Sequence, residues 1–110
     1  MAQKKDFKFP QDLMELSRFH FALSHPARLQ ILGRLKQATH ASFAELASNI
    51  PLHPSTTSQH ITILQRSNLL LPAELADGTT GYKINFDVYT YAKELMEIPL
   101  QRVVEDAHLT

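Results

Sequence analysis

The chain has 110 residues, enough for one domain with a modest hydrophobic core, and 44% of them are apolar. It has no cysteine, which excludes disulfides and thiolate metal sites, and it has no run of about 18 apolar residues, which excludes a membrane-spanning helix. No apolar signal core follows the first residues, so we expect a soluble cytoplasmic protein. The net charge is zero, but residues 1–40 carry seven Lys or Arg and three acidic residues, whereas residues 73–110 carry three and seven. The first part is therefore the expected face toward an anionic partner.

Two helices are predicted in the first 40 residues, after a basic segment, residues 1–10, that we expect to be a flexible arm. Apolar side chains recur at helical spacing over residues 11–23, at Leu13, Leu16, Phe19 and Leu23. Ser24 offers a hydroxyl cap, and Pro26 suits the first position of the next helix. The predicted core face of this second helix consists of Leu29, Ile31, Leu32 and Leu35.

Residues 42–67 have the pattern of a helix-turn-helix. Ser42 and Glu45 have the spacing of a capping box, so a short helix begins near Ser42 and ends before Pro51 and Pro54. The next helix begins at Pro54 and has a predicted buried stripe at Thr57, Ile61, Leu64 and Asn68. Hydrogen-bonding side chains outside this stripe are those of Ser55, Thr56, Gln59 and His60. Such a helix suits DNA recognition, although an ordinary amphipathic helix with a Ser- and Thr-rich outer face shows the same pattern.

A β-hairpin is predicted over residues 69–86. Apolar and polar residues alternate on both sides of a turn that contains Gly78, at Leu71, Ala73 and Leu75 before the turn and at Tyr82, Ile84 and Phe86 after it. A helix-turn-helix followed directly by a hairpin is a winged helix. The expected fold is therefore mainly α with a small β-hairpin, a winged helix-turn-helix in a single domain over residues 1–110.

The last helix is expected over residues 87–108. Asp87 is the predicted N-cap, and Pro99 must break or kink the helix. One side of this helix is apolar, at Val88, Tyr91, Leu95 and Ile98. An apolar stripe on each terminal helix favours burial against a second subunit.

Three segments resemble the ArsR/SmtB family of small bacterial repressors, and together they cover roughly residues 19–86. They are SHPARLQILGRL, FAELASNIPLHPSTTSQHITILQRSNLL and the hairpin with GYKINF. The most specific part is S-T-x-S-Q-H-I-x-x-L at residues 55–64. This resemblance implies a homodimer that binds double-stranded operator DNA, with the first and last helices packed across a two-fold axis and the recognition helices in successive major grooves.

These arguments predict two sets of site residues. The DNA-binding set is Ser55, Thr56, Ser58, Gln59, His60, Arg66 and Lys83. The dimer-interface set is Leu13, Leu16, Phe19, Tyr91, Leu95 and Ile98. We expect that one copy alone would leave Phe19, Leu95 and Ile98 poorly covered. Whether a small-molecule effector controls DNA binding is left open by the sequence.

The metal-ligand sets of well-known members of the resembled family are missing. Arsenic and lead sensors of this type use cysteines before the recognition helix, where this chain reads HASFAEL. Zinc and nickel sensors use a D-x-H and a later H-x-x-H or H-x-x-E, whereas this chain has only Glu105 and His108 there. Two ligands do not complete a zinc site, so we predict no metal and no cofactor. The alternative left open is that His20 and His25 join Glu105 and His108 across a dimer.

Two other classes of function fit the sequence less well. An enzyme is not expected, because the chain has no nucleophile elbow, no glycine-rich phosphate loop and no H-E-x-x-H motif. A winged-helix module that binds proteins rather than DNA is the alternative, because the wing contains Glu74 and Asp77 and only one basic residue, Lys83. The sequence as a whole favours a DNA-binding transcriptional regulator, and a repressor in particular.

Overall fold

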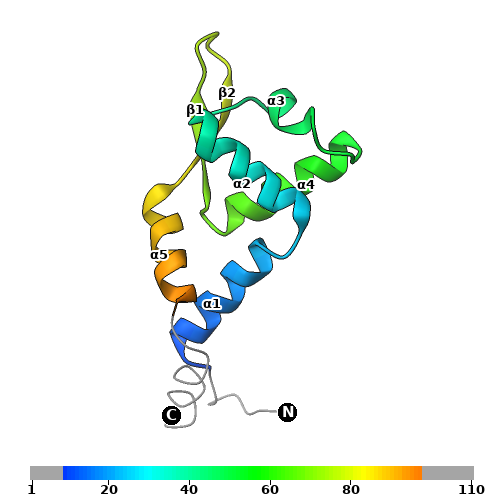
Figure 1. Cartoon of the computed structure of the whole chain (residues 1–110). Helices are drawn as coiled ribbons and strands as arrows, with labels where there is room; N and C mark the ends of the chain where they lie inside the picture. Colours follow the sequence, from blue (N-terminus) through cyan, green and yellow to red (C-terminus); the bar gives the residue numbers. More distant parts are fainter. Residues whose placement is uncertain (1–8, 98–110) are drawn as a thin grey trace.

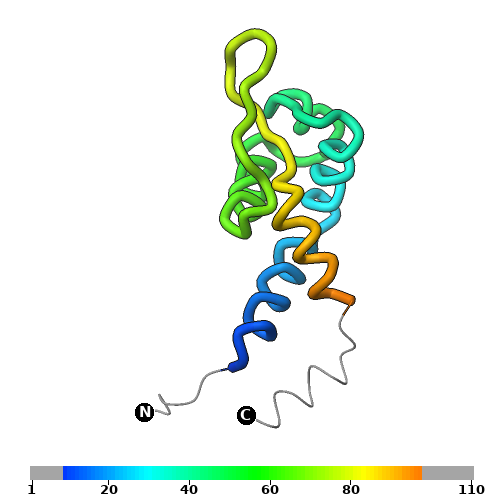
Figure 2. The backbone as a smooth tube through the Cα atoms, turned by 90° about the vertical axis from the view of Figure 1, so that its left-hand side faces the viewer, coloured from blue at the N-terminus to red at the C-terminus, as the bar shows by residue number. Residues whose placement is uncertain are grey.

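The computed structural model describes residues 9–97 and contains five helices and one hairpin in this part of the chain. In chain order the elements are α1 (Gln11–Ala22), α2 (Pro26–Ala38), α3 (Phe43–Ala47), α4 (Pro54–Arg66), β1 (Leu70–Glu74), β2 (Thr80–Ile84) and α5 (Phe86–Met96). Helices α2, α3 and α4 form a body from which the hairpin projects at one end, while α1 and α5 extend together from the other end (Figures 1 and 2). The predicted winged helix-turn-helix is confirmed. Residues 1–8 of the expected arm and residues 98–110 of the expected last helix lie outside the described part.

The predicted starts of α3 and α4 are confirmed. Ser42 Oγ accepts from the Glu45 amide at 3.0 Å, and Glu45 Oε1 accepts from the Ser42 amide at 2.8 Å. This is the capping box, and the hydrogen bonds from Ser42 lower the pKa of the Glu45 carboxyl. Pro54 occupies the start of α4, where a missing amide hydrogen costs nothing.

Two predicted caps are wrong. Helix α2 is capped by His25, whose Nδ1 accepts from the Ala27 amide at 3.0 Å, whereas the Ser24 hydroxyl donates back to the Phe21 carbonyl. Helix α5 begins before Asp87, because Asn85 Oδ1 accepts from the Val88 amide at 3.3 Å and takes the capping position. In both cases a neighbouring side chain with an acceptor at the right distance is the cap.

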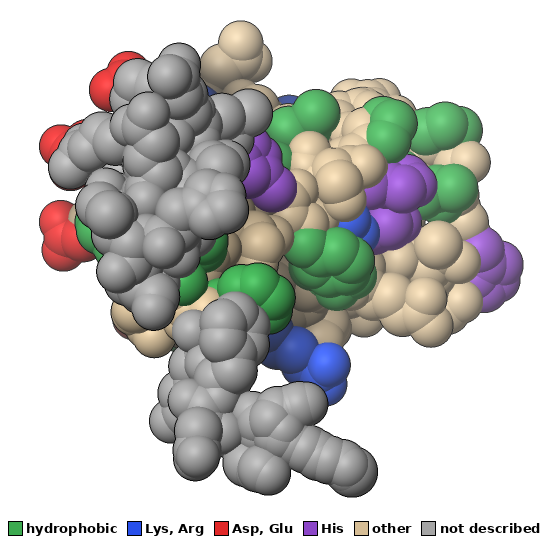
Figure 3. Space-filling model, turned by 90° about the horizontal axis from the view of Figure 1, so that it is seen from below, with side chains coloured by type: hydrophobic (Ala, Val, Ile, Leu, Met, Phe, Trp, Pro, Cys, Tyr) green, Lys and Arg blue, Asp and Glu red, His purple; other side chains and the backbone are tan. Residues whose placement is uncertain are grey.

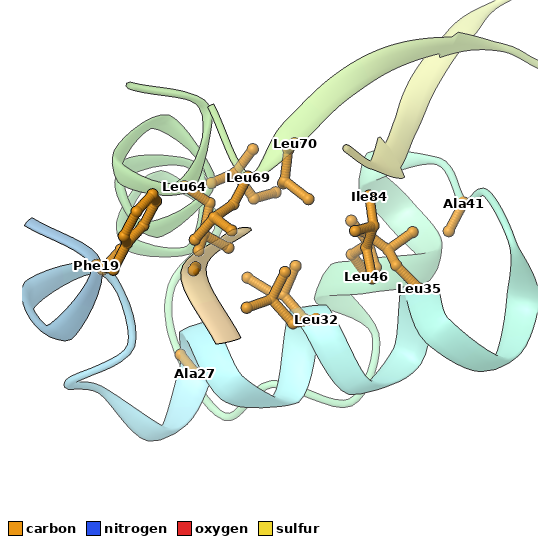
Figure 4. Packing of buried hydrophobic residues seen from close by; sticks show 14 of the residues in the cluster. Phe19, Ala27, Leu32, Leu35, Ala41, Leu46, Leu64, Leu69, Leu70 and Ile84 are labelled. Atoms are coloured by element: carbon orange, nitrogen blue, oxygen red, sulfur yellow. The ribbon is translucent and has the colours of Figure 1, made fainter. Parts of the chain in front are cut away.

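The core lies between α2, α4 and the base of the hairpin. Its fully buried side chains include Ile31 and Leu35 from α2, Ile61 and Leu64 from α4, and Leu69. Figure 4 shows Leu35, Leu46 and Ile84 converging from α2, α3 and β2. Leu29 was predicted for this core but is 52% exposed, because it lies on the outer side of α2.

The predicted buried position of Asn68 is also wrong, because α4 ends at Arg66. Asn68 has φ +63° and is exposed, its amide donates to the Gln65 carbonyl at 2.9 Å, and the Leu69 amide donates to the Leu64 carbonyl at 3.0 Å. This pair of bonds is a Schellman motif, in which a residue in the left-handed conformation ends the helix. The motif turns the chain so that Leu69, rather than Asn68, enters the core.

The wing is an antiparallel hairpin in which Leu70 pairs with Ile84 and Glu74 with Thr80. The buried residues of β1 are Leu70 and Ala73, whereas Leu71, predicted on the inner face, is 38% exposed. Phe86 does not continue the second strand as predicted but begins α5, where it is 53% exposed. The Schellman turn contributes to this burial pattern, because it directs Leu69 and Leu70 into the core at the start of β1.

Helices α1 and α5 pack against each other within one chain. The rings of Phe19 and Tyr91 meet edge to face at a centroid distance of 6.1 Å. Phe19 is 8% exposed and Leu95 is 6% exposed, so the expectation that a single copy leaves them poorly covered is wrong. Ile98, the third residue of that expectation, lies outside the described part. No helix within residues 9–97 is long and apolar enough to cross a membrane.

Gly81 allows the wing to join the body. The Ala41 and Tyr82 backbones exchange two hydrogen bonds of 3.1 and 2.9 Å, and a Cβ on Gly81 would lie 2.4 Å from the Ala41 carbonyl oxygen. We expect Gly81→Ala to lower the free energy of unfolding by about 1–3 kcal/mol, measured by urea denaturation, because backbone atoms must move. The matched control is Gly33→Ala on the exposed side of α2, where a Cβ meets nothing within 4 Å. That variant should be more stable by about 1 kcal/mol, and equal stabilities for the two variants would contradict this account.

Thr57 on α4 has a hydroxyl that is buried without a hydrogen-bond partner among the described residues. Its side chain is fully buried, so the hydroxyl pays a desolvation cost that Val, of similar shape, avoids. Thr57→Val should raise the free energy of unfolding by about 1 kcal/mol in the same measurement. Thr62→Val is the control, since the Thr62 hydroxyl donates to the Ser58 carbonyl at 3.0 Å and its removal should bring no gain. A clear loss of stability in Thr57→Val would show that the hydroxyl has a partner after all.

Candidate nucleic-acid interface

The outer surface of α4 is a continuous stripe of polar side chains. Ser55, Ser58, Gln59 and Arg66 are exposed, and their spacings of three, one and seven residues place them on one side of the helix. The opposite side carries Thr57, Ile61 and Leu64, all buried against the body. Thr62, half-buried, also falls on this stripe and was not predicted as a site residue. A helix anchored on one side and polar on the other can present base-reading groups to a groove.

The beginning of α4 is held by His53. Its Nδ1 accepts from the Ser55 amide at 3.2 Å and lies 2.9 Å from the Ser55 hydroxyl. Thr56, also predicted to bind DNA, is half-buried at the edge of the stripe. The Ser55 hydroxyl is therefore positioned beside the helix start, where backbone amides and the positive end of the helix dipole favour an anion such as a phosphate.

His60 differs from the other predicted DNA-binding residues of α4. Its side chain is half-buried, its Nδ1 lies 2.8 Å from Arg28 Nη1, and its ring centroid is 4.2 Å from that of His25. Burial lowers the pKa of His60, and the electrostatic interactions with His25 and Arg28 lower it further. The structure thus directs one ring nitrogen of His60 toward α2 rather than toward the outer stripe.

Arg28 is a buried residue that sequence analysis missed as a possible site residue. It is 5% exposed, and burial lowers the pKa of its guanidinium. Its Nε donates to the Ala22 carbonyl at 2.8 Å, and its Nη2 donates to the Phe21 carbonyl at 3.0 Å and to Ser24 Oγ at 3.2 Å. The available signal was the position of Arg28, which precedes Ile31 and Leu32 by three and four residues and so lies on the apolar side of the predicted helix. Arg28 connects the end of α1, the start of α2 and the middle of α4.

The two predicted DNA-binding cations lie on different elements, α4 and β2. Arg66 is exposed at the end of α4 and shares a hollow with Arg18, Phe21 and Ile63 between α1 and α4. Lys83 is exposed on β2, where its partner in the hairpin is Leu71.

The wing tip is acidic. Asp77 Oδ1 accepts from the Thr79 hydroxyl at 2.6 Å and from the Thr79 amide at 3.0 Å. These hydrogen bonds lower the pKa of Asp77, so this carboxylate stays ionised at neutral pH. Glu74 lies at the end of β1. Two acidic residues at this position oppose close contact between the wing tip and phosphate.

Histidines and carboxylates occupy different parts of the described surface seen from below. In that view acidic side chains lie along one edge, and histidine side chains lie over the middle and the opposite part (Figure 3). Among residues 9–97 no three His, Asp or Glu side chains gather closely enough to hold a metal ion. Glu105 and His108, needed for the alternative zinc site, lie outside the described residues, while His25 caps α2 and stacks on His60.

Comparison with known proteins agrees with this geometry. A family model described as a helix-turn-helix domain matches residues 23–73, which include α2, α3, α4 and most of β1. No curated protein sequence matches the chain. Among solved structures, an ArsR family transcriptional regulator is 26% identical, with a TM-score of 0.64 over 96% of this chain and 97% of that one.

Two further solved structures are similar over most of the chain. HlyU from Vibrio cholerae is 28% identical, with a TM-score of 0.61 over 77% of this chain and 91% of that one. The winged helix-turn-helix domain of Mb0332 from Mycobacterium bovis, described as homodimeric and DNA-binding and as a possible ArsR-family regulator, is 28% identical, with a TM-score of 0.60 over 88% of this chain and 83% of that one. With its winged fold and exposed helix α4, the chain is a winged helix-turn-helix transcriptional regulator that is similar to ArsR-family regulators over most of its length.

Proposed function

We propose that this regulator is a repressor that binds operator DNA as a homodimer, with α4 in the major groove. The observation that carries the proposal is the polar stripe on α4, which lies opposite a side that is fully occupied by core contacts. An α-helix fits the major groove, where each base pair shows a distinct set of donors and acceptors. A protein bound across a promoter excludes RNA polymerase, so repression is the expected consequence.

The proposed DNA contacts divide by chemistry. Gln59 is the base-reading candidate, because its amide can both donate to and accept from an adenine edge. The hydroxyls of Ser55, Thr56 and Ser58 suit bases or backbone oxygens, and Arg66 and Lys83 suit phosphates. His60 has a smaller part in this proposal than the other residues of α4, because its Nδ1 is engaged by Arg28.

Dimerisation is proposed through the outer sides of α1 and α5. Leu16, Phe19 and Leu95 are buried inside one chain, so the exposed apolar side chains nearby are the better candidates. Met14 is 41% exposed and Tyr91 is 44% exposed, and a hollow is lined by Phe9, Leu13, Met14 and Ser17. The exposed side chains of Met14 and Tyr91 on these helices favour burial against a second copy. The Mycobacterium bovis domain is described as homodimeric, which supports a dimer of this chain as well.

DNA binding is tested by selecting duplexes from a random-sequence pool with the purified protein at low salt. We expect enrichment of a two-fold symmetric sequence, and Gln59→Ala should weaken binding to the selected duplex by about 1–3 kcal/mol if Gln59 makes a paired base contact. Gln37→Ala, at an exposed glutamine near the end of α2, is the matched control and should bind like the wild type.

Two results would contradict this part of the proposal. Unchanged affinity in a folded Gln59→Ala variant would remove Gln59 from the base-reading set. Failure of the wild type to enrich any duplex would favour the other candidate function, a winged helix that binds proteins, for which the acidic wing is the supporting observation.

Dimerisation is tested by sedimentation equilibrium at micromolar concentration. The wild type should be a dimer, and Met14→Glu should raise the dissociation constant of the dimer at least about tenfold, because it places a charge in an apolar contact. Gln37→Glu carries the same added charge on another exposed helix surface and should leave the dimer intact. A monomeric wild type, or a Met14→Glu dimer of unchanged stability, would show that this surface is not the interface.

A further inference from the structure

We propose that Arg28 and neutral His60 are positioning residues for DNA binding, which together fix the recognition helix α4 against α2 and the end of α1. The inference rests on the proposed function, since the position of α4 matters only if this helix enters DNA. It gives His60 a role distinct from base contact. It also predicts that DNA binding depends on the protonation of one identified imidazole.

The guanidinium of Arg28 is the centre of the arrangement. Three of its hydrogen bonds go to Ala22, Phe21 and Ser24, at the end of α1 and just after it. The Phe21 and Ala22 carbonyls lie at the negative end of the helix dipole, so the buried charge is compensated without a carboxylate. The fourth bond, from Nη1 to His60 Nδ1 at 2.8 Å, is the one that reaches α4. Arg28 is therefore held on one side and acts on α4 through His60.

The chemistry of the pair determines the state of the imidazole. A guanidinium has N–H donors and no acceptor, so Nδ1 of His60 must carry a lone pair and the ring proton must be on Nε2. A second proton on Nδ1 removes the acceptor and places a cation beside Arg28. His25, whose ring stacks on His60, adds a further positive charge when it is protonated.

No carboxylate opposes this effect among the groups that influence His60. Arg28 from α2 and His25 from the segment before α2 are the two charged or titratable groups that act on His60 in the described structure, and both lower its pKa, as burial does. Neutral His60 is thus the form that the folded protein favours. Because the pKa is lower in the folded state than in the unfolded chain, this contribution to stability is complete above about pH 6.5 and is lost as the pH falls below that value toward the folded-state pKa.

Two neighbouring histidines also accept hydrogen bonds through Nδ1. His25 Nδ1 accepts from the Ala27 amide at 3.0 Å, and His53 Nδ1 accepts from the Ser55 amide at 3.2 Å. The caps of α2 and α4 thus use the same ring nitrogen, Nδ1, that His60 turns toward Arg28.

The sign of the expected pH effect separates this proposal from ordinary electrostatics. Protonation of surface histidines adds positive charge and should strengthen the attraction to DNA phosphates. Loss of the bond between Arg28 and His60 should instead weaken DNA binding as the medium becomes more acidic. We expect wild-type affinity for the selected duplex to fall by about tenfold or more between about pH 7.5 and about pH 5.5, the size expected for loss of a charged hydrogen bond.

Variants at position 60 isolate the imidazole. His60→Asn offers a similarly placed oxygen that accepts from Arg28 but does not titrate, so it should bind DNA at neutral pH nearly as well as the wild type and lose most of the acid sensitivity. His60→Leu removes the acceptor and should bind weakly at both pH values, with a circular dichroism spectrum to confirm folding. His53→Asn and His25→Asn retain capping oxygens and measure the share of the two caps. His20→Asn, at an exposed histidine on α1, should keep the wild-type pH profile.

A second measurement tests the hydrogen bond without DNA. Imidazole ¹⁵N chemical shifts of the free protein should show His60 with an unprotonated Nδ1 at neutral pH and a pKa below that in the unfolded chain. Detection of the other tautomer, or acid weakening of DNA binding that persists unchanged in His60→Asn, would overturn the positioning role. If the wild type enriches no duplex, the proposed function and the positioning role fail together, while the ¹⁵N shifts still decide whether the pair exists.

Discussion

The structure depends most on the burial of one side of α4 against α2 and the base of the hairpin. Ile61 and Leu64 belong to the same buried cluster as Ile31 and Leu35, and each such side chain contributes about 1.5–3 kcal/mol when it is removed from water. Because α4 packs into the core through this side, the residues on its other side do not contribute to the core. The polar stripe can therefore vary in sequence without loss of the fold, which is what a family of regulators with different operators requires.

The turn at Asn68 and the cap at Asn85 connect this core to the hairpin and to α5. The Schellman turn at Asn68 directs Leu69 and Leu70 inward, and this sets the register in which Leu70 faces Ile84. At the other end of the hairpin, Asn85 caps α5 while its amide donates to the Leu69 carbonyl at 2.9 Å. Helix α5 is thereby started beside the end of α4, and it then runs along α1 (Figure 2). The proposed DNA-binding helix and the proposed dimer surface are thus connected through the hairpin and α5.

Arg28 is a buried polar residue that connects these elements by hydrogen bonds. A buried cation is costly unless its donors are satisfied, and here each of its three nitrogens has an acceptor from the chain. The acceptors come from the end of α1 and from α4, which are far apart in sequence. Arg28 therefore links α1, which carries part of the proposed dimer surface, to α4 through one side chain.

The sequence by itself determined the elements whose signals are local. The capping box at Ser42, the proline at the start of α4 and the turn at Gly78 each depend on residues a few positions apart, and for this reason the winged fold was predictable. Only the tertiary structure decided which strand residues face inward and what His60 contacts. Those outcomes depend on distances between segments, as in the bond from Arg28 to His60 across 32 positions, and helical periodicity contains no information about such distances.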